Sequence, residues 1–322
     1  MCALAVFDPV QSDLALVETE IQRAGQVEYQ VLASLLQHVL TSRGKRVRPA
    51  LVLLSASFHD YVLDYLVPLA AAIELLHTAT LVHDDLIDNS PTRRGKPTLH
   101  QLASRSVTVL VGDYLFANAA ALCTETKNTR VMQVFGRALM TICDGELKQI
   151  FTAGHWRQTR EEYYQKIDRK TASLLRTATE TGAILSGAPE EQITALRNYG
   201  YHLGLAFQVV DDVLDFIGDE ATMGKPVGSD LRQGTVTLPV IRLLEEDPDN
   251  EAIRRVLDDG DTSDEAISAA VAAVRGSSGI DYARKEARRF TQNAVGYLAP
   301  LPATPGRAAL ETMADYVVER MT

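Results

Sequence analysis

Two copies of an aspartate-rich pattern, each at the end of a long apolar run, constrain this chain more than any other feature. The patterns are DDLID at residues 84–88 and DDVLD at residues 211–215. A helix that is apolar on every side is buried in the core of a large helical protein. Carboxylates crowded together away from water need cations beside them. We therefore expect the two clusters to face each other across a cavity that holds divalent ions.

The spacing within each copy fits metal binding. Asp84 and Asp88 are one helical turn apart on one face, with His77 two turns earlier on the same line. Asp211 and Asp215 repeat this spacing, with Gln208 on their face. Paired carboxylates can hold Mg²⁺ and leave coordination sites for phosphate oxygens and water. For the first copy alone, a solvated acidic helix end with a hydrogen-bonded core histidine is the alternative interpretation. The two copies could also be two unrelated solvated helix ends.

Basic residues suited to phosphate recur along the chain. Arginine offers planar donor forks that match phosphate oxygens, although a basic turn is more often simply solvated. The candidates are Arg93 and Arg94 after the first cluster, Lys45, Arg46 and Arg48 in the turn at 44–49, Lys170 beside Thr171, and Lys225. Together they suggest two phosphate pockets, one held by metal and one by direct basic contacts.

Composition sets the fold class and excludes several functions. The chain has 322 residues, of which 46% are hydrophobic, and alternating β-branched stretches are rare, so we expect a single all-α domain spanning 1–322. A net charge of −10 argues against a nucleic-acid surface. No membrane span is expected, because no stretch of about 18 uninterrupted apolar residues occurs. Three cysteines without ligand spacing fit a reducing, cytoplasmic compartment.

The expected elements are helices joined by short connections, with no strand. One helix is expected to begin at Pro68 and run to Asp85, and a glycine-rich loop is expected over 218–239. The other predicted helices are two within 10–42, one ending near Phe58, and those at 101–126, 129–151, 160–187, 190–216 and from 240 onward.

Nearly the whole chain resembles the trans-isoprenyl diphosphate synthases, the polyprenyl synthetase family, of the medium- to long-chain type. The motifs that carry the resemblance are GKRVRP at 44–49, ELLHTATLVHDDLIDNSPTRRG at 74–95, GDYLFA at 112–117, KTASL at 170–174, FQVVDDVLD at 207–215 and GKPVGSDL at 224–231. The resemblance implies an orthogonal helical bundle around a central cavity, usually a homodimer.

The resemblance also assigns roles to residues of this sequence. It implies that Mg²⁺ gripping an allylic diphosphate is bound by Asp84, Asp88 and Asp211, with Asp85, Asp212 and Asp215 ligating directly or through water. It implies that the same diphosphate is contacted by Arg93, Lys170 and Lys225, and that the diphosphate of isopentenyl diphosphate is bound by Lys45, Arg48, His77 and Arg94. Thr171 and Gln208 would lie beside the reacting carbons and stabilise the allylic cation.

The implied reaction is ionisation, condensation and elimination, which requires no protein nucleophile. The product would grow into an apolar tunnel whose length is set by side chains before Asp84. The small Thr80 and Ala79 stand where bulky residues close the tunnel in short-chain members. Leu76 could narrow the tunnel and Phe135 is a candidate for its floor, although both could be ordinary core residues. We therefore expect a product longer than fifteen carbons.

Two alternative functions stay open, and the sequence departs from the family pattern at two places. A class I terpene cyclase shares the first acidic motif but does not need a second diphosphate pocket. A subunit of a heteromeric synthase would tend to lose the acidic motifs, which this chain keeps. Thr235 stands where many family members carry lysine, which puts one phosphate contact in doubt, and the ERMT tail is assigned no substrate role.

Overall fold

The computed structural model describes residues 5–41, 44–152, 156–218 and 226–321. These residues are all-α apart from one two-stranded ladder. The chain forms two compact units that interleave in sequence. Unit 1 comprises residues 1–139, 174–200 and 297–312, and unit 2 comprises residues 140–173, 201–296 and 313–322.

Unit 1 contains the N-terminal helices and the first acidic cluster. Its elements are η1 (Ala5–Val10), α1 (Gln11–Arg23), α2 (Gln30–Leu40), α3 (Val47–Ala56), α4 (Leu63–Ile87), β1 (Thr92–Arg93), β2 (Lys96–Pro97), α5 (Leu99–Leu102) and α6 (Arg105–Glu125). Five helices have residues in both units: α7 (Thr129–Phe151), α9 (Ser173–Leu185), α10 (Glu190–Ile217), α16 (Gly279–Tyr297) and α17 (Pro305–Glu319).

Helix α4 is the core helix of unit 1 and ends in the first acidic cluster. It is apolar on nearly every side, and residues 68–76 along it are all buried. The predicted start at Pro68 was wrong, because the helix begins at Leu63 and Pro68 lies inside it. The proline removes only one N–H, which would otherwise bond to the carbonyl of Asp64. This loss near the N-terminus is evidently tolerated.

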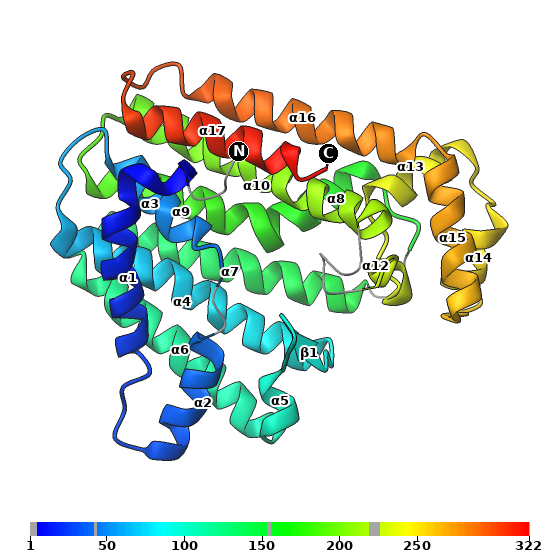
Figure 1. Ribbon diagram of the computed structural model, residues 1–322, viewed down its shortest axis with the longest axis horizontal. Coiled ribbons are helices and arrows are strands. Elements are labelled where there is room, and N and C mark those ends of the chain that lie inside the picture. The colour runs from blue at the N-terminus through cyan, green and yellow to red at the C-terminus, as the bar shows by residue number, and fades with distance from the viewer. Residues whose placement is uncertain (1–4, 42–43, 153–155, 219–225, 322) are drawn as a thin grey trace. The chain divides into compact units, whose positions relative to one another are not determined.

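Helices α4 and α6 run side by side in unit 1 (Figure 1). Gly112 of the GDYLFA motif makes their contact possible, since a Cβ at this position would collide with the imidazole of His83. His83 in turn lies 3.2 Å from the carbonyl oxygen of Val109 and 3.6 Å from the carboxylate of Asp113. The glycine thus lets α6 approach the last two turns of α4.

A short hairpin after α4 corrects the expectation that the chain has no strand. Strands β1 and β2 pair antiparallel, and the two turn residues between them, Arg94 and Gly95, both have positive φ. A two-residue turn of this kind matches the twist of a hairpin. The sequence shows no alternation of apolar and polar residues that would predict these strands, because each has only two residues. The hairpin holds Arg93 and Arg94 just beyond the first acidic cluster.

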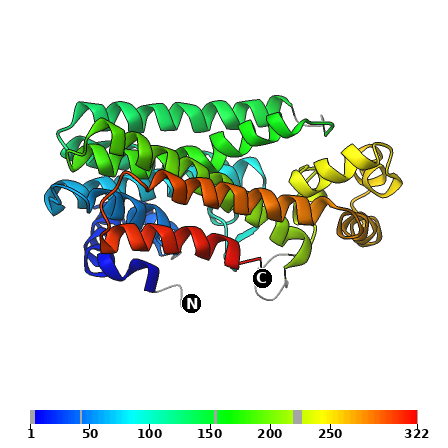
Figure 2. The same cartoon turned by 90° about the horizontal axis from the view of Figure 1, so that it is seen from above.

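Unit 2 contains the second acidic cluster and most of the C-terminal half. Its own elements are α8 (Arg160–Ile167), η2 (Asp168–Ala172), α12 (Ser229–Arg232), α13 (Leu238–Glu246), α14 (Glu251–Leu257) and α15 (Asp264–Gly276). Helices α14 and α15 pack against each other (Figure 2). The expected loop at 218–239 contains the short helix α12, and α13 begins at Leu238.

The predicted helix over 160–187 is confirmed, with one irregularity. Between α8 and α9 the chain forms a π-helical turn, η2, which contains Lys170 and Thr171. Such turns insert an extra residue into a helix and occur often at functional sites. Helix α10 packs tightly against this turn at Gly204, where a Cβ would lie 2.5 Å from the Cα of Ala172. The close approach aligns η2 with the part of α10 that leads into the second acidic cluster.

Helices α4 and α6 are also long and apolar enough, by length and composition, to cross a membrane. The most apolar window of α4 is 67% buried, as expected for a core helix, whereas that of α6 is only 39% buried. Helix α6 therefore presents an apolar face that unit 1 does not cover.

Candidate active site

The first acidic cluster forms at the C-terminal end of α4. The N–H of Asp88, which caps the helix, donates to the carbonyl oxygen of Asp84 at 2.8 Å, so these residues lie one turn apart as the spacing predicted. Asp84 is half-buried and Asp88 is exposed, whereas Asp85 is only 6% exposed. The three aspartates are therefore not equivalent. Asp84 and Asp88 are the accessible pair.

The carboxylate of Asp85 binds the hairpin through Arg93. Its carboxylate accepts hydrogen bonds from Arg93, with Nε 2.8 Å from each oxygen and Nη2 2.7 Å from Oδ1. A multidentate guanidinium–carboxylate pair is among the stronger and more directional polar contacts in proteins. The pair fixes the hairpin relative to α4. Asp85 therefore orients Arg93 in this structure, and its role as a metal ligand stays a prediction.

Four arginines lie near His77, two turns before the cluster. Burial lowers the pKa of His77 well below its usual value, and the positive charges of Arg48, Arg94, Arg93 and Arg46 lower it further. The imidazole is therefore neutral near pH 7 and offers one donor and one acceptor. The structure thus brings together the predicted substrate-binding residues Arg48, His77, Arg93 and Arg94.

The basic turn contacts the hairpin directly. A Cβ on Gly44 would lie 3.1 Å from both terminal nitrogens of Arg94, so the guanidinium of Arg94 packs over this glycine. Desolvation lowers the pKa of Arg94, and the neighbouring Arg93 and Arg46 lower it further against the opposing effect of Glu74. Lys45 is exposed beside this group. A bound anion would offset the mutual repulsion of these cations.

A pocket in unit 1 opens onto this basic group. Its lining includes Glu74, His77, Arg93, Arg94 and Lys96 together with the apolar Leu81. Polar groups that converge on a partly apolar recess are typical of a small-molecule site. His77 and Arg94 of the predicted metal-free diphosphate pocket line this recess, whereas Lys45 and Arg48 are not among its lining residues. The assignment of the pocket to a diphosphate stays a prediction.

One arginine of the basic turn has a structural role. Arg46 adopts a left-handed conformation with φ 52° at the start of α3. Its guanidinium bonds to Glu18 of α1 at 2.8 Å and to Glu74 of α4 at 2.9 Å. Arg46 therefore joins three helices through its side chain and backbone, which leaves Lys45 and Arg48 as the ligand candidates of this turn.

The second acidic cluster forms along the last two turns of α10 in unit 2. Asp211 is half-buried and pairs with Arg320, whose Nη2 lies 2.7 Å from Oδ1. Asp215 is fully buried and accepts the backbone N–H of Asp230 at 3.1 Å. The C-terminal arginine was not predicted to lie here. No sequence signal links a lone arginine in the tail to a motif more than a hundred residues earlier.

Asp212 is buried, and both of its oxygens are occupied. The phenol of Tyr163 donates to Oδ2 at 2.5 Å, and the amide of Gln208 donates to Oδ1 at 2.9 Å. Burial, reinforced by the negative charge of Asp230, raises the pKa of Asp212 to about 7, although the bonds from Tyr163 and Gln208 and the charge of Lys166 oppose this. Asp212 is thus directed into the protein.

The two residues expected beside the reacting carbons lie in contact. The hydroxyl of Thr171 donates to Oε1 of Gln208 at 2.7 Å. Lys170, on the same π turn, lies 3.0 Å from the carboxylate of Glu146. Lys225 falls outside the residues that the structure describes.

The predicted chain-length residues all lie in unit 1. Leu76 and Ala79 have no exposed surface, and Phe135 on α7 is 5% exposed. Thr80 is half-buried, and its hydroxyl donates to the carbonyl oxygen of His77 at 2.7 Å. Thr80 is therefore the only one of the four with appreciable accessible surface, while their role in setting product length stays a prediction.

The carboxylates fit a divalent cation that is shared with a substrate. In the described part of the chain, no three His, Cys, Asp or Glu side chains are grouped so that they could hold a metal ion by themselves. Asp84 and Asp88 supply two accessible hard-oxygen donors at one helix end. Mg²⁺ is usually held by one or two carboxylates, with phosphate oxygens and water completing its octahedron. This donor set therefore suits a cation that arrives with a diphosphate.

Comparison with known proteins gives one consistent family. Residues 29–274 match the model of the polyprenyl synthetase family. Heptaprenyl diphosphate synthase component 2 of Geobacillus stearothermophilus is 38% identical over 316 residues, which cover 98% of each chain. Octaprenyl diphosphate synthase of Escherichia coli is 33% identical over 310 residues, which cover 96% of each.

The solved structures agree with the sequence relatives. A polyprenyl synthase of Caulobacter crescentus, crystallised with calcium and isoprenyl diphosphate, superposes with a TM-score of 0.94 at 34% identity. The match covers 99% of this chain and 98% of that one. The all-α class expected from the sequence is therefore confirmed as the isoprenoid synthase fold.

Proposed function

This chain belongs to the polyprenyl synthetase family, and from that premise we propose how its residues bind and transform two diphosphate substrates. The chain is a prenyltransferase. It condenses isopentenyl diphosphate with an allylic diphosphate and yields a longer trans-polyprenyl diphosphate, geranylgeranyl or longer, plus pyrophosphate. A cyclase would not combine two diphosphates, so that alternative is set aside. The family uses a divalent metal.

The first element of the proposal is the site for the allylic diphosphate. Asp84, Asp88 and Asp211 would bind Mg²⁺, because they are the accessible carboxylates of the two clusters. Bound cations would neutralise the diphosphate and make it a better leaving group. Arg93 and Lys170 would contact the same group, and Lys225 is assigned there by the family resemblance.

The second element is the site for isopentenyl diphosphate. Lys45, Arg48, His77 and Arg94 would bind its diphosphate without metal. The four arginines around His77 support this assignment, since their repulsion favours an anion among them. A neutral imidazole donates one hydrogen bond to a phosphate oxygen and adds no further charge.

The reaction follows from these two sites. The bond between C1 and oxygen of the allylic substrate breaks, and its electron pair leaves with pyrophosphate. The double bond of isopentenyl diphosphate then attacks the allylic cation, which forms the new carbon–carbon bond. A proton is lost from the adduct to the released pyrophosphate. The oxygens of Thr171 and Gln208 would stabilise the cation, and apolar walls would exclude the water that otherwise quenches it.

The accessible Asp84–Asp88 pair at the end of a buried apolar helix carries this proposal, and variants of both clusters test it. Asp84→Ala and Asp211→Ala should each lower incorporation of labelled isopentenyl diphosphate about a hundredfold or more. Asp64→Ala, at the exposed opposite end of α4, is the matched control and should leave the rate unchanged. Normal turnover of either cluster variant would refute the metal assignment.

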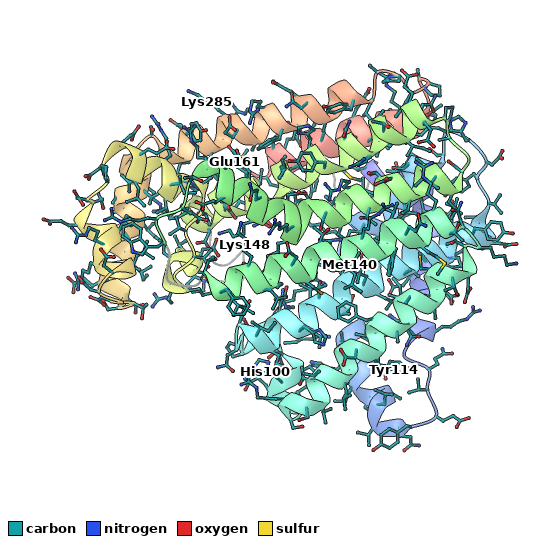
Figure 3. All side chains as sticks on the ribbon, turned by 180° about the vertical axis from the view of Figure 1, so that it is seen from behind. His100, Tyr114, Met140, Lys148, Glu161 and Lys285 are labelled. Atoms are coloured by element: carbon teal, nitrogen blue, oxygen red, sulfur yellow. The ribbon has the colours of Figure 1, made fainter. Side chains whose placement is uncertain are left out.

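We also propose that the protein acts as a homodimer through α6. Val109 and Leu110 are 41% and 66% exposed, and Ala117, Ala120 and Ala121 continue this apolar face. Figure 3 labels Tyr114, half-buried on the same helix. Burial of such a face against a second copy would remove apolar surface from water. Leu110→Glu should therefore convert a dimer into a monomer in light scattering.

One relative suggests a different assembly. The Geobacillus protein is named component 2 of its synthase, so a second kind of subunit is the alternative partner. Activity of the purified chain with Mg²⁺ separates the two, since a homodimer needs no other protein. An inactive, monomeric chain would favour the heteromeric assembly.

We propose a cytoplasmic location. Cys123 and Cys143 are free thiols, which suits a reducing compartment. Subcellular fractionation with an antibody to the native chain tests this, and recovery in an extracytoplasmic fraction would contradict it.

A further inference from the structure

A chain of three hydrogen bonds links a buried tyrosine to the threonine beside the reacting carbons. It runs from Tyr163 of α8 to Asp212 of α10, from Gln208 to the same Asp212, and from Thr171 of η2 to Gln208. The three donor–acceptor distances are 2.5, 2.9 and 2.7 Å. Tyr163 has no exposed surface and Asp212 is 3% exposed, so water does not compete for the inner bonds.

The structure gives the direction of each bond. Both oxygens of Asp212 accept, so a donor stands at each of them. The Tyr163 hydroxyl supplies one of these donors, and the amide NH₂ of Gln208 must supply the other. The carbonyl end of the Gln208 amide then necessarily faces Thr171. A carbonyl oxygen has no proton to give, so the Thr171 hydroxyl must donate to it.

This direction decides what Thr171 can offer a substrate. A hydroxyl has one proton and two lone pairs. Because the proton is directed at Gln208, the lone pairs are left for another partner. Lone pairs stabilise positive charge that develops nearby, whereas a hydroxyl proton in their place would repel it. The network therefore holds Thr171 in the state that favours an allylic cation.

We propose that Tyr163 and Asp212 are positioning residues that set the polarity of the Gln208–Thr171 pair for catalysis. The inference rests on the proposed placement of Thr171 and Gln208 beside the reacting carbons. It gives Asp212 a different role from that of Asp211 within the same motif, since both carboxylate oxygens of Asp212 are used inside the protein.

The backbone supports the same arrangement. The π turn of η2 carries Thr171 and joins α8, which carries Tyr163. Gly204, one turn before Gln208, lets α10 contact that π turn at Ala172. Helix α10 thus contacts the α8–η2 segment at both ends of the network, at Ala172 and at Tyr163. These two contacts keep the three hydrogen bonds aligned.

The adjacent tyrosine provides a matched control for the test. Tyr164 also donates to a carboxylate, but to that of Glu286, at 2.7 Å. Tyr163→Phe and Tyr164→Phe each remove one such bond from the same helix. We expect Tyr163→Phe to lower kcat about tenfold, with KM for both substrates within about twofold of wild type. Tyr164→Phe should leave kcat within about twofold of wild type.

A second variant reverses the direction of the Gln208–Thr171 hydrogen bond without changing the shape of the side chain at residue 212. In Asp212→Asn, the new NH₂ would donate to Gln208, which must flip its amide, and Thr171 would then have to accept. We expect a fall in kcat of about a hundredfold at unchanged folding, as judged by thermal melting. If Tyr163→Phe matches Tyr164→Phe, or if Asp212→Asn keeps wild-type kcat, the positioning role is overturned.

Thr171→Val tests the placement of Thr171 beside the reacting carbons separately from the positioning role of Tyr163 and Asp212. A loss of kcat in Thr171→Val supports the placement of Thr171 beside the cation, whatever the tyrosine variants do. Wild-type kcat in Thr171→Val would overturn that placement and the positioning role together. A loss in Thr171→Val without a loss in Tyr163→Phe would overturn the positioning role alone.

Discussion

Arg320, near the C-terminus, forms an ion pair with Asp211, the first aspartate of the second acidic cluster. Nη2 of Arg320 lies 2.7 Å from Oδ1 of Asp211, and the guanidinium also lies over the ring of Phe207, 4.9 Å from its centroid. The side chains are 24% and 38% exposed. The tail thus supplies a cation to a carboxylate that is proposed to bind metal, although no substrate role was predicted for this segment.

The ion pair predicts a competition between Arg320 and the metal. A cation that binds Asp211 must displace the guanidinium or share the carboxylate with it. In Arg320→Gln this competitor is lost, so the Mg²⁺ concentration for half-maximal rate should fall. A partly exposed ion pair contributes about 0.2–1 kcal/mol, which corresponds to a decrease of up to about fivefold. Initial rates over a Mg²⁺ titration measure this.

Arg289→Gln is the control for the Arg320 prediction. Arg289 pairs with Glu286 on α16, at 2.6 Å, and is likewise part of unit 2. Its removal should not change the metal requirement. A higher Mg²⁺ requirement in Arg320→Gln would show that the arginine assists binding instead of competing.

Most helices and the local geometry of both acidic clusters could be predicted from the sequence. Long apolar runs set α4 and α10, and the i, i+4 spacing of Asp84 and Asp88 needs only helical geometry. The family resemblance placed Thr171 near Gln208, and the structure brings them into hydrogen-bond contact.

Contacts between distant parts of the chain could not be predicted in this way. Tyr163 and Asp212 are 49 residues apart, and no periodicity connects them. The different partners of neighbouring residues could not be predicted either. Asp85 pairs with Arg93 while Asp84 stays accessible, because the helix turns them to different sides and the hairpin reaches only one. Position within a motif therefore indicated the site but not each residue's partner.

Arg46 is predicted to stabilise unit 1 and not to bind substrate. Glu74 is 5% exposed, and Arg46→Met would leave its charge buried without this partner. Removing one member of a buried ion pair costs about 3 kcal/mol or more, and partial exposure of Glu18 reduces that figure somewhat. Urea unfolding should show this loss. Arg23→Met breaks an exposed pair with Glu20 on α1 and should cost about 0.5 kcal/mol or less.

If Arg46 instead contacted a diphosphate, the pattern would be reversed. Arg46→Met would then raise KM for a substrate at nearly wild-type unfolding free energy.

His77 predicts a pH dependence of stability. Its pKa in the folded protein lies well below 6.5, because burial and the surrounding arginines disfavour the imidazolium. The unfolded chain therefore binds the proton more readily, so stability is fully present above about pH 6.5 and decreases as the pH falls below it. Melting temperatures between pH 7.5 and 5.5 should show this decrease.

The same series with His77→Gln isolates the contribution of the imidazole. This variant has no titrating group at the position, so its melting temperature should fall less steeply with acid than that of the wild type. His100→Gln, on the short helix α5, serves as the control and should keep the wild-type slope. Equal slopes for wild type and His77→Gln would contradict the prediction.

Product length should respond to the side chain at Thr80. Thr80 is half-buried four residues before Asp84, whereas the neighbouring Ala79 has no exposed surface. A phenylalanine at Ala79 would overpack the core at a cost of about 1–3 kcal/mol, so Thr80→Phe is the cleaner probe. If residue 80 faces the growing chain, the phenyl ring of Thr80→Phe blocks further elongation. Chromatography of the dephosphorylated products should then show shorter chains, while Thr80→Val, which replaces the hydroxyl with a methyl group of similar size, should keep the wild-type length. An unchanged product in Thr80→Phe, at wild-type melting temperature, would place the elongation tunnel elsewhere.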